Sequence, residues 1–442
     1  MDRRHFLAAT GGGIIGTLLS GCGGGGSGIS SDVNKTTLER SAPATPPATG
    51  GAGKSRVIVI GGGMGGAAVA KYLRLWGDGV DVTLIERQPT YTSCIMSSLV
   101  LTGQRTLASL AFDYDKLRTL YGINTVFDEV VGIDPVAAKV TLASGGTLAA
   151  DRIVMAPGIE FDDVPGLGTS DKMPHAWKAG PQTALLAGQL KAMPAGGVVV
   201  LTIPKAPYRC PPGPYERACL LADWLKRYKP GSKLIVLDAN PDFVTEKDNF
   251  TNAFLGLHGS VIDYHTNVEV TQVDPATMTL TTTGGAIRGD VVNLIPRQRA
   301  GSLVTKTGLN NATEGRFAGV DVLSYASTVQ GADKVHIIGD SSATTQPKAG
   351  HIANQEGQVC ADAVSRILVG QQPDPAPVTN SACFSTITMQ QASWLTAVFQ
   401  YDATTMAMKP VAASSAASSG WNSDNFQDMG IWFKALMGDT FA

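Results

Sequence analysis

The sequence predicts an α/β protein with two Rossmann-like domains followed by a small C-terminal α+β domain. Three observations predict this class. Residues 57–60 are a continuous β-branched apolar run that precedes a glycine-rich turn and a helical pattern. A second strand-like run at 196–204 opens a central region, and a third at 332–342 returns to the first domain. A chain of 442 residues is long enough for two or three such domains.

The overall charge excludes one broad class of function. The net charge is −2 and charged residues make up 16% of the chain. Electrostatic capture of nucleic acid needs a concentrated basic face, which this composition does not predict.

The N-terminus carries a predicted export signal over residues 1–21. Arg3 and Arg4 precede a short, weakly apolar stretch, which is typical of a Tat signal. The stretch ends in "LLSGC", which resembles a lipobox and predicts a lipid anchor on Cys22, on the periplasmic side of a membrane. An ordinary signal with an incidental cysteine is the alternative. Residues 22–54 are rich in Gly, Ser, Thr, Ala and Pro, so they predict a flexible tether.

A dinucleotide-binding motif opens the folded body. Gly61, Gly63 and Gly66 fit G-x-G-x-x-G between a strand and a helix, and Glu86 ends the next strand. Glycines allow the backbone to approach a pyrophosphate, the helix N-terminus stabilises its charge, and the acid accepts hydrogen bonds from ribose hydroxyls. Strand, loop, helix and acid together predict a bound dinucleotide.

Two later segments favour FAD over NAD. Residues 145–158 form a predicted strand ending in a small turn, as flavoproteins of this architecture use on returning to the first domain. The later strand ends at Gly339 and Asp340, where an aspartate typically binds the ribityl chain of FAD. Lys348 lies near the start of the following helix, whose dipole would stabilise negative charge at the N1/C2=O edge of the flavin. A solvated lysine is the alternative for Lys348.

The domain boundaries follow from these motifs. We expect an FAD domain over 55–165 and 297–372, a central domain over 166–296 and a C-terminal domain over 373–442. The central domain lacks a nicotinamide loop, because "YRCPPGPYERAC" stands where a second glycine loop is expected. Proline has no N–H to donate to a pyrophosphate. An NADH-dependent reductase is therefore not expected.

The cysteines carry the remaining chemistry. They are Cys22, Cys94, Cys210, Cys219, Cys360 and Cys383. None has metal-ligand spacing, so no metal site is predicted. Cys94 lies in a segment expected beneath the flavin, where it is either a thioether link or a small buried side chain. Cys210 and Cys360 are expected to converge on the flavin face. They form either a redox disulfide or a structural one.

Residues 55–442 resemble the flavoprotein subunit of flavocytochrome c sulfide dehydrogenase, a relative of sulfide:quinone oxidoreductases. The segments that carry the resemblance include "GGGMGGA", "PTYTSCIMSSLVLTG", "YRCPPGPYERA", "PKAGHIANQEGQVCADAV" and "WNSDNFQDMGIWFKALMGDTFA". "YRCPPGPYERA" is the most specific of them, and the match is collinear over nearly the whole folded body.

The resemblance implies roles for individual residues. Cys94 matches the cysteine that holds FAD through an 8α-S-cysteinyl bond, and Cys210 with Cys360 matches the redox-active disulfide above the flavin. Glu216 matches a glutamate proposed to move protons, with a helix-dipole partner as the alternative. Cys219 is expected in the core, and Cys383 has no expected role.

The resemblance also implies a reaction. Hydrosulfide would attack the disulfide, electrons would pass through FAD, and sulfur would leave as sulfane sulfur or polysulfide. The chain has no C-x-x-C-H haem motif, so a separate c-type cytochrome is the expected electron acceptor. A sulfide:quinone oxidoreductase and a lipid-anchored, non-catalytic flavoprotein are the alternatives.

Overall fold

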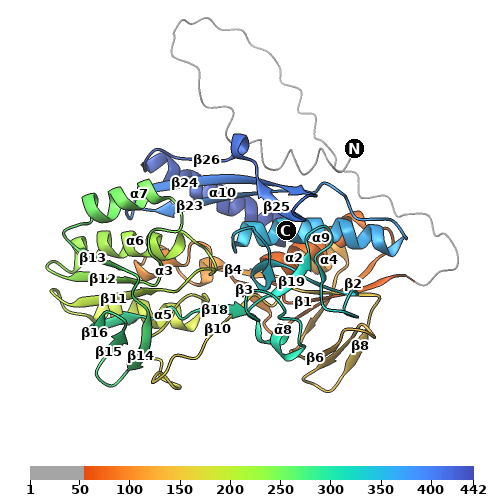
Figure 1. The fold of residues 1–442 in the computed structure, drawn as a ribbon, viewed down its shortest axis with the longest axis horizontal. Coiled ribbons are helices and arrows are strands. Elements are labelled where there is room, and N and C mark those ends of the chain that lie inside the picture. Colours follow the sequence, from red (N-terminus) through yellow and green to blue (C-terminus); the bar gives the residue numbers. More distant parts are fainter. Residues whose placement is uncertain (1–53) are drawn as a thin grey trace, which may run out of the picture. The chain divides into compact units, whose positions relative to one another are not determined.

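The computed structural model describes residues 54–442. The predicted export signal, the Cys22 anchor and the tether up to residue 53 lie outside the described residues. The coloured ribbon in Figure 1 begins with the first predicted strand.

The first domain is a mostly parallel sheet in the order β22-β19-β20-β21-β9-β1-β2-β5. Five strands pair in parallel, β1(Arg56–Ile60), β2(Asp81–Glu86), β5(Asn124–Phe127), β9(Arg152–Met155) and β21(Val335–Ile337). Three short strands extend the sheet beyond β21, namely β19(Ala318–Asp321), β20(Ala326–Ser327) and β22(Ser342–Ala343). Residues 57–60 of β1 are buried on both faces, as expected for a parallel strand between two others. Strand β9 joins β1 to β21, so the chain returns to this sheet as the sequence predicts.

Helices and short hairpins surround this sheet. The helices are α2(Met64–Trp76), α3(Ser98–Leu101), α4(Asp115–Tyr121), α8(Ser302–Lys306) and α9(Gly350–Leu368). The small strands are β3(Thr90–Thr92), β4(Ala111–Asp113), β6(Val130–Asp134), β7(Lys139–Leu142), β8(Thr147–Ala149), β10(Ile159–Phe161) and β18(Gln298–Ala300). Helices α2 and α9 pack closely, because Gly357 of α9 lies against the backbone of Gly65 and Val69. This packing brings the start of α9 to the dinucleotide loop.

The central domain has its own parallel sheet in the order β13-β12-β11-β17. The strands are β11(Val198–Ile203), β12(Lys233–Asp238), β13(Ile262–Thr266) and β17(Val291–Asn293). Helices α5(Pro181–Ala192), α6(Gly213–Tyr228) and α7(Lys247–Thr251) and the π-helical turn η2(Asn252–Leu257) accompany them. A small antiparallel sheet of β14(Val270–Asp274), β15(Thr279–Thr282) and β16(Gly285–Arg288) completes the domain.

The C-terminal domain lies across both Rossmann-like domains in Figure 1. It consists of β23(Val378–Thr386), β24(Ala392–Asp402), β25(Ala407–Pro410), β26(Ala416–Ala417) and α10(Ser423–Phe441). Strand β23 contacts α6 of the central domain as well as α9 of the first domain. The predicted fold class is confirmed, and one strand of the C-terminal domain borders both halves of the molecule.

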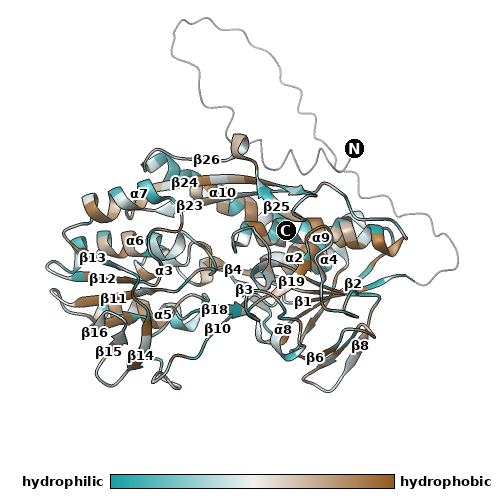
Figure 2. Cartoon of the chain, in the orientation of Figure 1, coloured by the Kyte–Doolittle hydropathy of each residue, from teal (hydrophilic) through white to brown (hydrophobic). Residues whose placement is uncertain are grey.

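Hydrophobic colour in Figure 2 follows the inner strands β1 and β11, as expected for strands with both faces covered. No helix within residues 54–442 is long and apolar enough to cross a membrane. The same residues contain no cluster of His, Cys, Asp and Glu arranged to hold a metal ion.

Candidate active site

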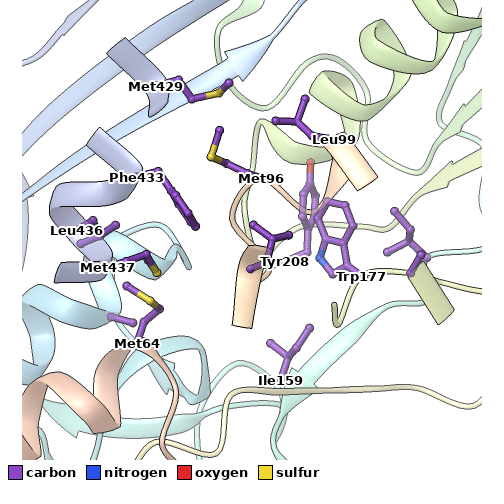
Figure 3. Packing of buried hydrophobic residues seen from close by; sticks show 14 of the residues in the cluster. Met64, Met96, Leu99, Ile159, Trp177, Tyr208, Met429, Phe433, Leu436 and Met437 are labelled. Atoms are coloured by element: carbon purple, nitrogen blue, oxygen red, sulfur yellow. The ribbon is translucent and has the colours of Figure 1, made fainter. Parts of the chain in front are cut away.

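A large cavity lies where the three domains meet. With its open mouth it has a volume of about 1300 Å³. The predicted site residues that line it are Gly63, Cys94, Cys210, Glu216, Gly339 and Asp340. Figure 3 shows apolar side chains that surround this region, with Met64 on α2, Met429 on α10, and Trp177 and Tyr208 on the central-domain side.

The dinucleotide loop has the close backbone approach that its glycines predict. Gly61 has a φ of 93° and donates from its N–H to Ile85 O at 2.9 Å. A Cβ on Gly66 would lie 1.7 Å from Gly61 O, so only glycine fits there. Gly63 is the N-cap of α2, and no side chain caps that helix end. The first-turn N–H groups of α2 are therefore available for a phosphate group.

Glu86 lies beside this loop, at the end of β2. Its Oε2 accepts from Gly62 N at 2.7 Å, and its Oε1 accepts from Gln88 N at 3.1 Å. The carboxylate is thereby fixed next to the loop, where the motif predicts a ribose ligand.

Asp340 has a feature that a bound ligand would explain. Its carboxyl lies in the cavity wall, and its Oδ1 is buried with no hydrogen-bond partner among the described residues. Burial raises the pKa of Asp340, although Arg209 and Lys348 oppose that rise. A buried acceptor of this kind is rare without a partner, and a hydroxyl of a ribityl chain would supply one.

Lys348 does not occupy the predicted position. Its Nζ donates to Ser342 O at 2.6 Å and lies 3.9 Å from the centre of the Phe317 ring. It lines a smaller neighbouring cavity and not the main one. In this structure the ammonium group contacts the Ser342 carbonyl and the Phe317 ring and does not line the main cavity, where the flavin edge was predicted. Lys348 instead contributes its backbone O, which accepts from Cys210 N at 2.6 Å.

Cys210 is held in an unusual backbone conformation. Its φ is 59°, a left-handed value that a non-glycine residue seldom adopts. Two hydrogen bonds fix it, from Cys210 N to Lys348 O and from Gly213 N to Cys210 O at 2.9 Å. A Cβ on Gly213 would lie 2.8 Å from Cys210 Sγ, so glycine lets the thiol rest on the start of α6. Strain maintained in this way is common at functional sites.

The structure does not bring Cys360 to the cavity that Cys210 lines, although the sequence predicts that the two cysteines converge there. Cys360 is 0% exposed and does not line the cavity. It lies ten residues into α9, roughly 15 Å along the axis from the cavity-lining Gly350. Burial and then the nearby charge of Glu356 raise the pKa of Cys360. Cys360 therefore lies on a part of α9 that is buried in the hydrophobic core.

Cys383 occupies the place that was expected for Cys360. It lies on β23 and lines the same cavity as Cys210. Burial raises the pKa of Cys383 well above its ordinary value, and the next contribution is the charge of Cys210. The two cysteines are free thiols in this structure. Sequence reasoning found no role for Cys383, because only the docking of β23 against α6 brings it here.

Glu216 lies on the first turns of α6, where the prolines place it. Its Oε1 accepts from Thr386 Oγ1 at 2.9 Å. Burial is the main cause that raises the pKa of Glu216 to about 7, against the opposing hydrogen bonds from Thr386. Glu216 is also the acid in the first turn of α6, so the helix-dipole alternative stays a prediction beside the proton-carrying role. A group with this pKa can accept and release a proton near neutral pH.

Cys94 lines the cavity from the segment after β3. Its Sγ accepts from Ala179 N at 3.4 Å, and its O accepts from Ser97 N at 3.1 Å. It lines the cavity and is only partly buried, so its thiol faces the space in which a cofactor would lie.

Two arginines in the cavity wall were missed by sequence reasoning. Arg209 and Arg217 lie on either side of Cys210 in the chain, and both line the cavity. The signal was present in "YRCPPGPYERA", because Arg217 directly precedes the apolar helical run at 218–222. Its full burial could not be read from that pattern.

The chain shares recognisable features with known proteins. A family model described as "Sulfide dehydrogenase [flavocytochrome c] flavoprotein chain, central" matches residues 183–296, and "Pyridine nucleotide-disulphide oxidoreductase" matches residues 55–184. The sulfide dehydrogenase flavoprotein chain of Chlorobaculum thiosulfatiphilum is 46% identical over 48 residues, which is 11% of this chain and all of the relative's known sequence. The chain belongs to the flavocytochrome c sulfide dehydrogenase flavoprotein family.

More distant matches agree on the architecture. The chain is 35% identical over 105 residues to apoptosis-inducing factor homolog B of Dictyostelium discoideum, which is 24% of this chain and a quarter of the relative's length. The sulfide:quinone oxidoreductase structure from Aquifex aeolicus has a TM-score of 0.72 at 18% identity, covering 87% of this chain and 91% of that one. Membership of the flavocytochrome c sulfide dehydrogenase flavoprotein family makes the chain a flavin-binding oxidoreductase.

The residues of this structure fit FAD. The uncapped start of α2 suits the pyrophosphate, Glu86 lies where a ribose is expected, and the unpartnered Asp340 Oδ1 suits a ribityl hydroxyl. A Cβ on Gly63 would meet only Tyr91, at 3.8 Å, so the loop leaves open space on its cavity side.

Proposed function

We propose that the protein is an FAD-dependent sulfide dehydrogenase in which Cys210 and Cys383 form the redox-active disulfide. The observation that carries the proposal is that both cysteines line one cavity together with Glu216 and the residues that fit FAD. Family membership and the match to a sulfide dehydrogenase flavoprotein chain support sulfide as the substrate.

The first step is a thiol–disulfide exchange. Hydrosulfide attacks one sulfur of the Cys210–Cys383 disulfide, an S–S bond forms to the attacking sulfur, and the bond between the cysteines breaks. One cysteine becomes a persulfide and the other leaves as a thiolate, so charge is conserved. FAD, when bound, supplies a two-electron acceptor that can return electrons one at a time.

Glu216 is the proton carrier in this proposal. The sulfur that attacks as hydrosulfide retains one proton, which must leave before sulfane sulfur or polysulfide is released. The Glu216 carboxyl lies in the same cavity and has a pKa raised to about 7, so its ionised form accepts that proton near neutral pH.

Cys94 is proposed as the covalent attachment point for FAD. Its partly buried thiol borders the cavity and accepts from the backbone N–H of Ala179. A thioether there would fix the cofactor without removing any hydrogen bond donated by the protein.

The electron acceptor is proposed to be a separate c-type cytochrome. The protein is also proposed to be exported by Tat and anchored through Cys22 on the periplasmic side of a membrane. The chain carries no haem attachment motif of its own. Stopped-flow reoxidation of the sulfide-reduced protein, with cytochrome c in one arm and a soluble quinone in the other, tests the first point. Faster reoxidation by quinone would assign the sulfide:quinone alternative.

The central experiment is anaerobic addition of sulfide to the purified flavoprotein, followed by flavin absorbance. Wild type should bleach, and Cys210→Ser and Cys383→Ser should each slow bleaching by at least a hundredfold. Cys360→Ser is the matched control and should bleach as wild type does. If Cys360→Ser abolishes bleaching while Cys383→Ser bleaches fully, the disulfide joins Cys210 to Cys360, as the sequence predicts. No bleaching of wild type would favour the non-catalytic flavoprotein.

A further inference from the structure

Arg217 is a buried cation with neutral partners. It is 1% exposed, yet it lines the cavity. Its Nη1 donates to Asn293 Oδ1 at 2.9 Å and to His175 O at 3.3 Å, its Nη2 donates to Ala176 O at 2.9 Å, and its Nε donates to Ser98 Oγ at 3.3 Å. Within residues 54–442 it forms no ion pair. A buried charge without an opposite charge is costly, so it usually marks the place of a ligand of opposite sign.

Arg209 adds a second positive charge to the same wall. Its guanidinium donates to Trp177 O, while the Arg217 guanidinium lies 4.7 Å from the centre of the Trp177 ring. Arg209 is also without an ion pair among the described residues. The two cations therefore contact one tryptophan, one through its carbonyl and one through its ring.

Trp177 is itself a donor without an acceptor. It is 5% exposed and lines the cavity, and its Nε1 has no hydrogen-bond partner among the described residues. Two guanidinium groups and one indole N–H without a partner therefore place three donor groups in this part of the wall.

The acids in the cavity act on these cations without pairing directly with them. Arg217 opposes the pKa rise of Glu216, and Arg209 opposes that of Asp340, but neither carboxyl lies within ion-pair distance of either guanidinium among the described residues. Glu216 Oε1 accepts from Thr386, and Asp340 fits the ribityl chain of FAD. The dinucleotide loop at the start of α2 is a separate place for the phosphates. The positive charges also act on His175, whose carbonyl O accepts from Arg217. Burial, and then the charges of Lys178, Arg217 and Arg209, lower the pKa of the His175 imidazole to about 3.

We infer that Arg209, Arg217 and Trp177 form an anion site that binds hydrosulfide, and then the anionic polysulfide, beside Cys210. This inference rests on the proposed function and states that the substrate binds as the hydrosulfide anion. The cavity would hold one negative charge before the exchange, on hydrosulfide, and one after it, on the leaving thiolate. The same two cations therefore balance the negative charge throughout the step, which neutral side chains could not do.

The test uses two alkylating probes of similar size and different charge on the full flavoprotein after reduction of its disulfide. Iodoacetate is an anion and iodoacetamide is neutral, and mass spectrometry measures the rate at Cys210 for each. An anion site raises the iodoacetate-to-iodoacetamide rate ratio above that of a free thiol such as glutathione. In Arg217→Gln the ratio should fall by on the order of tenfold, which one lost charge at short range would produce. Arg217→Lys should keep most of the effect.

The controls separate charge from folding. Arg299→Gln removes an exposed arginine that lies outside the cavity and should leave the ratio unchanged. If Arg217→Gln does not fold, the wild-type ratio compared with glutathione still decides the question. A wild-type ratio no higher than that of glutathione overturns the anion site, as does a ratio unaffected by Arg217→Gln. Because neither rate depends on flavin reduction, bleaching by sulfide tests the proposed function separately.

Discussion

At the scale of single residues, burial gives Glu216 and the cavity thiols their chemistry. Glu216 is buried, so desolvation favours its neutral form and raises its pKa to about 7. Burial and then the charge of Glu216 raise the pKa of Cys210 to about 12. A resting thiol at Cys210 is therefore protonated near neutral pH.

Glu216→Gln should remove a titration from the pH profile. In wild type, the rate of flavin bleaching by sulfide should rise with pH through about 7, because the ionised carboxylate accepts the proton. With the rate expressed per hydrosulfide ion, so that the ionisation of hydrogen sulfide is removed, Glu216→Gln should lower it by about 10²-fold or more and that inflection should vanish. Anaerobic stopped-flow absorbance at a series of pH values measures both. A variant that retains the inflection would remove Glu216 from the mechanism.

The same shift predicts the sign of a stability effect. The folded protein retains the Glu216 proton more tightly than the unfolded chain, whose carboxyl has the ordinary pKa of 4.5. The free energy of unfolding therefore falls as pH rises from about 4.5 to 7, and this contribution has a slope of at most about 1.4 kcal/mol per pH unit. Denaturant titrations at several pH values should show a flatter dependence for Glu216→Gln than for wild type.

At the scale of elements, the start of α6 sets the position of the reactive thiol. Pro212 is the N-cap and Pro214 stands in the first turn, positions where a missing N–H costs little. Gly213 lies between them, packed under Cys210 Sγ. The segment that removes a nicotinamide loop is the segment that supports Cys210.

Gly213→Ala should disturb this support. The added Cβ would lie 2.8 Å from Cys210 Sγ and 2.9 Å from the Trp177 ring, so both side chains must shift. We expect a loss of about 1–3 kcal/mol in the free energy of unfolding and slower bleaching by sulfide. Gly188→Ala in α5 is the matched control, because its Cβ would meet nothing within 4 Å. It should be neutral or slightly stabilising, and equal losses in both variants would show that crowding at Cys210 is not the cause.

At the scale of the whole molecule, the C-terminal domain completes the cavity. It contributes Cys383, Phe384, Met429 and Trp432 to the wall. Glu246, beside α7 of the central domain, fastens it by accepting from Ser385 Oγ and Ser393 Oγ, each at 2.6 Å. The position of Cys383 therefore depends on contacts between domains.

Glu246→Ala should loosen this junction. Hydrogen bonds to a charged group contribute about 1.5–3 kcal/mol each, so the free energy of unfolding should fall by about 2–4 kcal/mol. Glu269→Ala is the control, since Glu269 forms only an exposed ion pair with Lys205 at 3.8 Å. Chemical denaturation measures both variants, and a loss in Glu246→Ala no larger than in the control would contradict the role of the junction.

The central domain also predicts that NADH does not serve as an electron donor. Asp238 ends β12, where a Rossmann domain presents an acid to ribose, but its Oδ2 accepts from Tyr215 at 2.7 Å and from Tyr264 at 2.8 Å. Asn240 N and Asn240 Nδ2 bind its Oδ1. Anaerobic NADH should therefore leave the flavin absorbance unchanged while sulfide bleaches it. Rapid bleaching by NADH would contradict this interpretation of the domain.

Local patterns predicted the parts of the site that lie close together in sequence. The glycine loop, Glu86 and the Asp340 turn each follow a strand within a few residues, so the strand fixes their place. The Cys210 segment was likewise predicted to support a thiol, since its prolines and the helix after it are adjacent to the cysteine.

The sequence by itself determined the fold class, the dinucleotide loop and the absence of a nicotinamide loop, because strand periodicity, glycine and proline act over short distances along the chain. Tertiary structure alone decided that Cys383 and not Cys360 shares the cavity with Cys210, that Lys348 turns away, and that Arg217 is buried without an ion pair. Those outcomes depend on which face of α9 enters the core and on how β23 docks against α6, and packing between distant segments settles both.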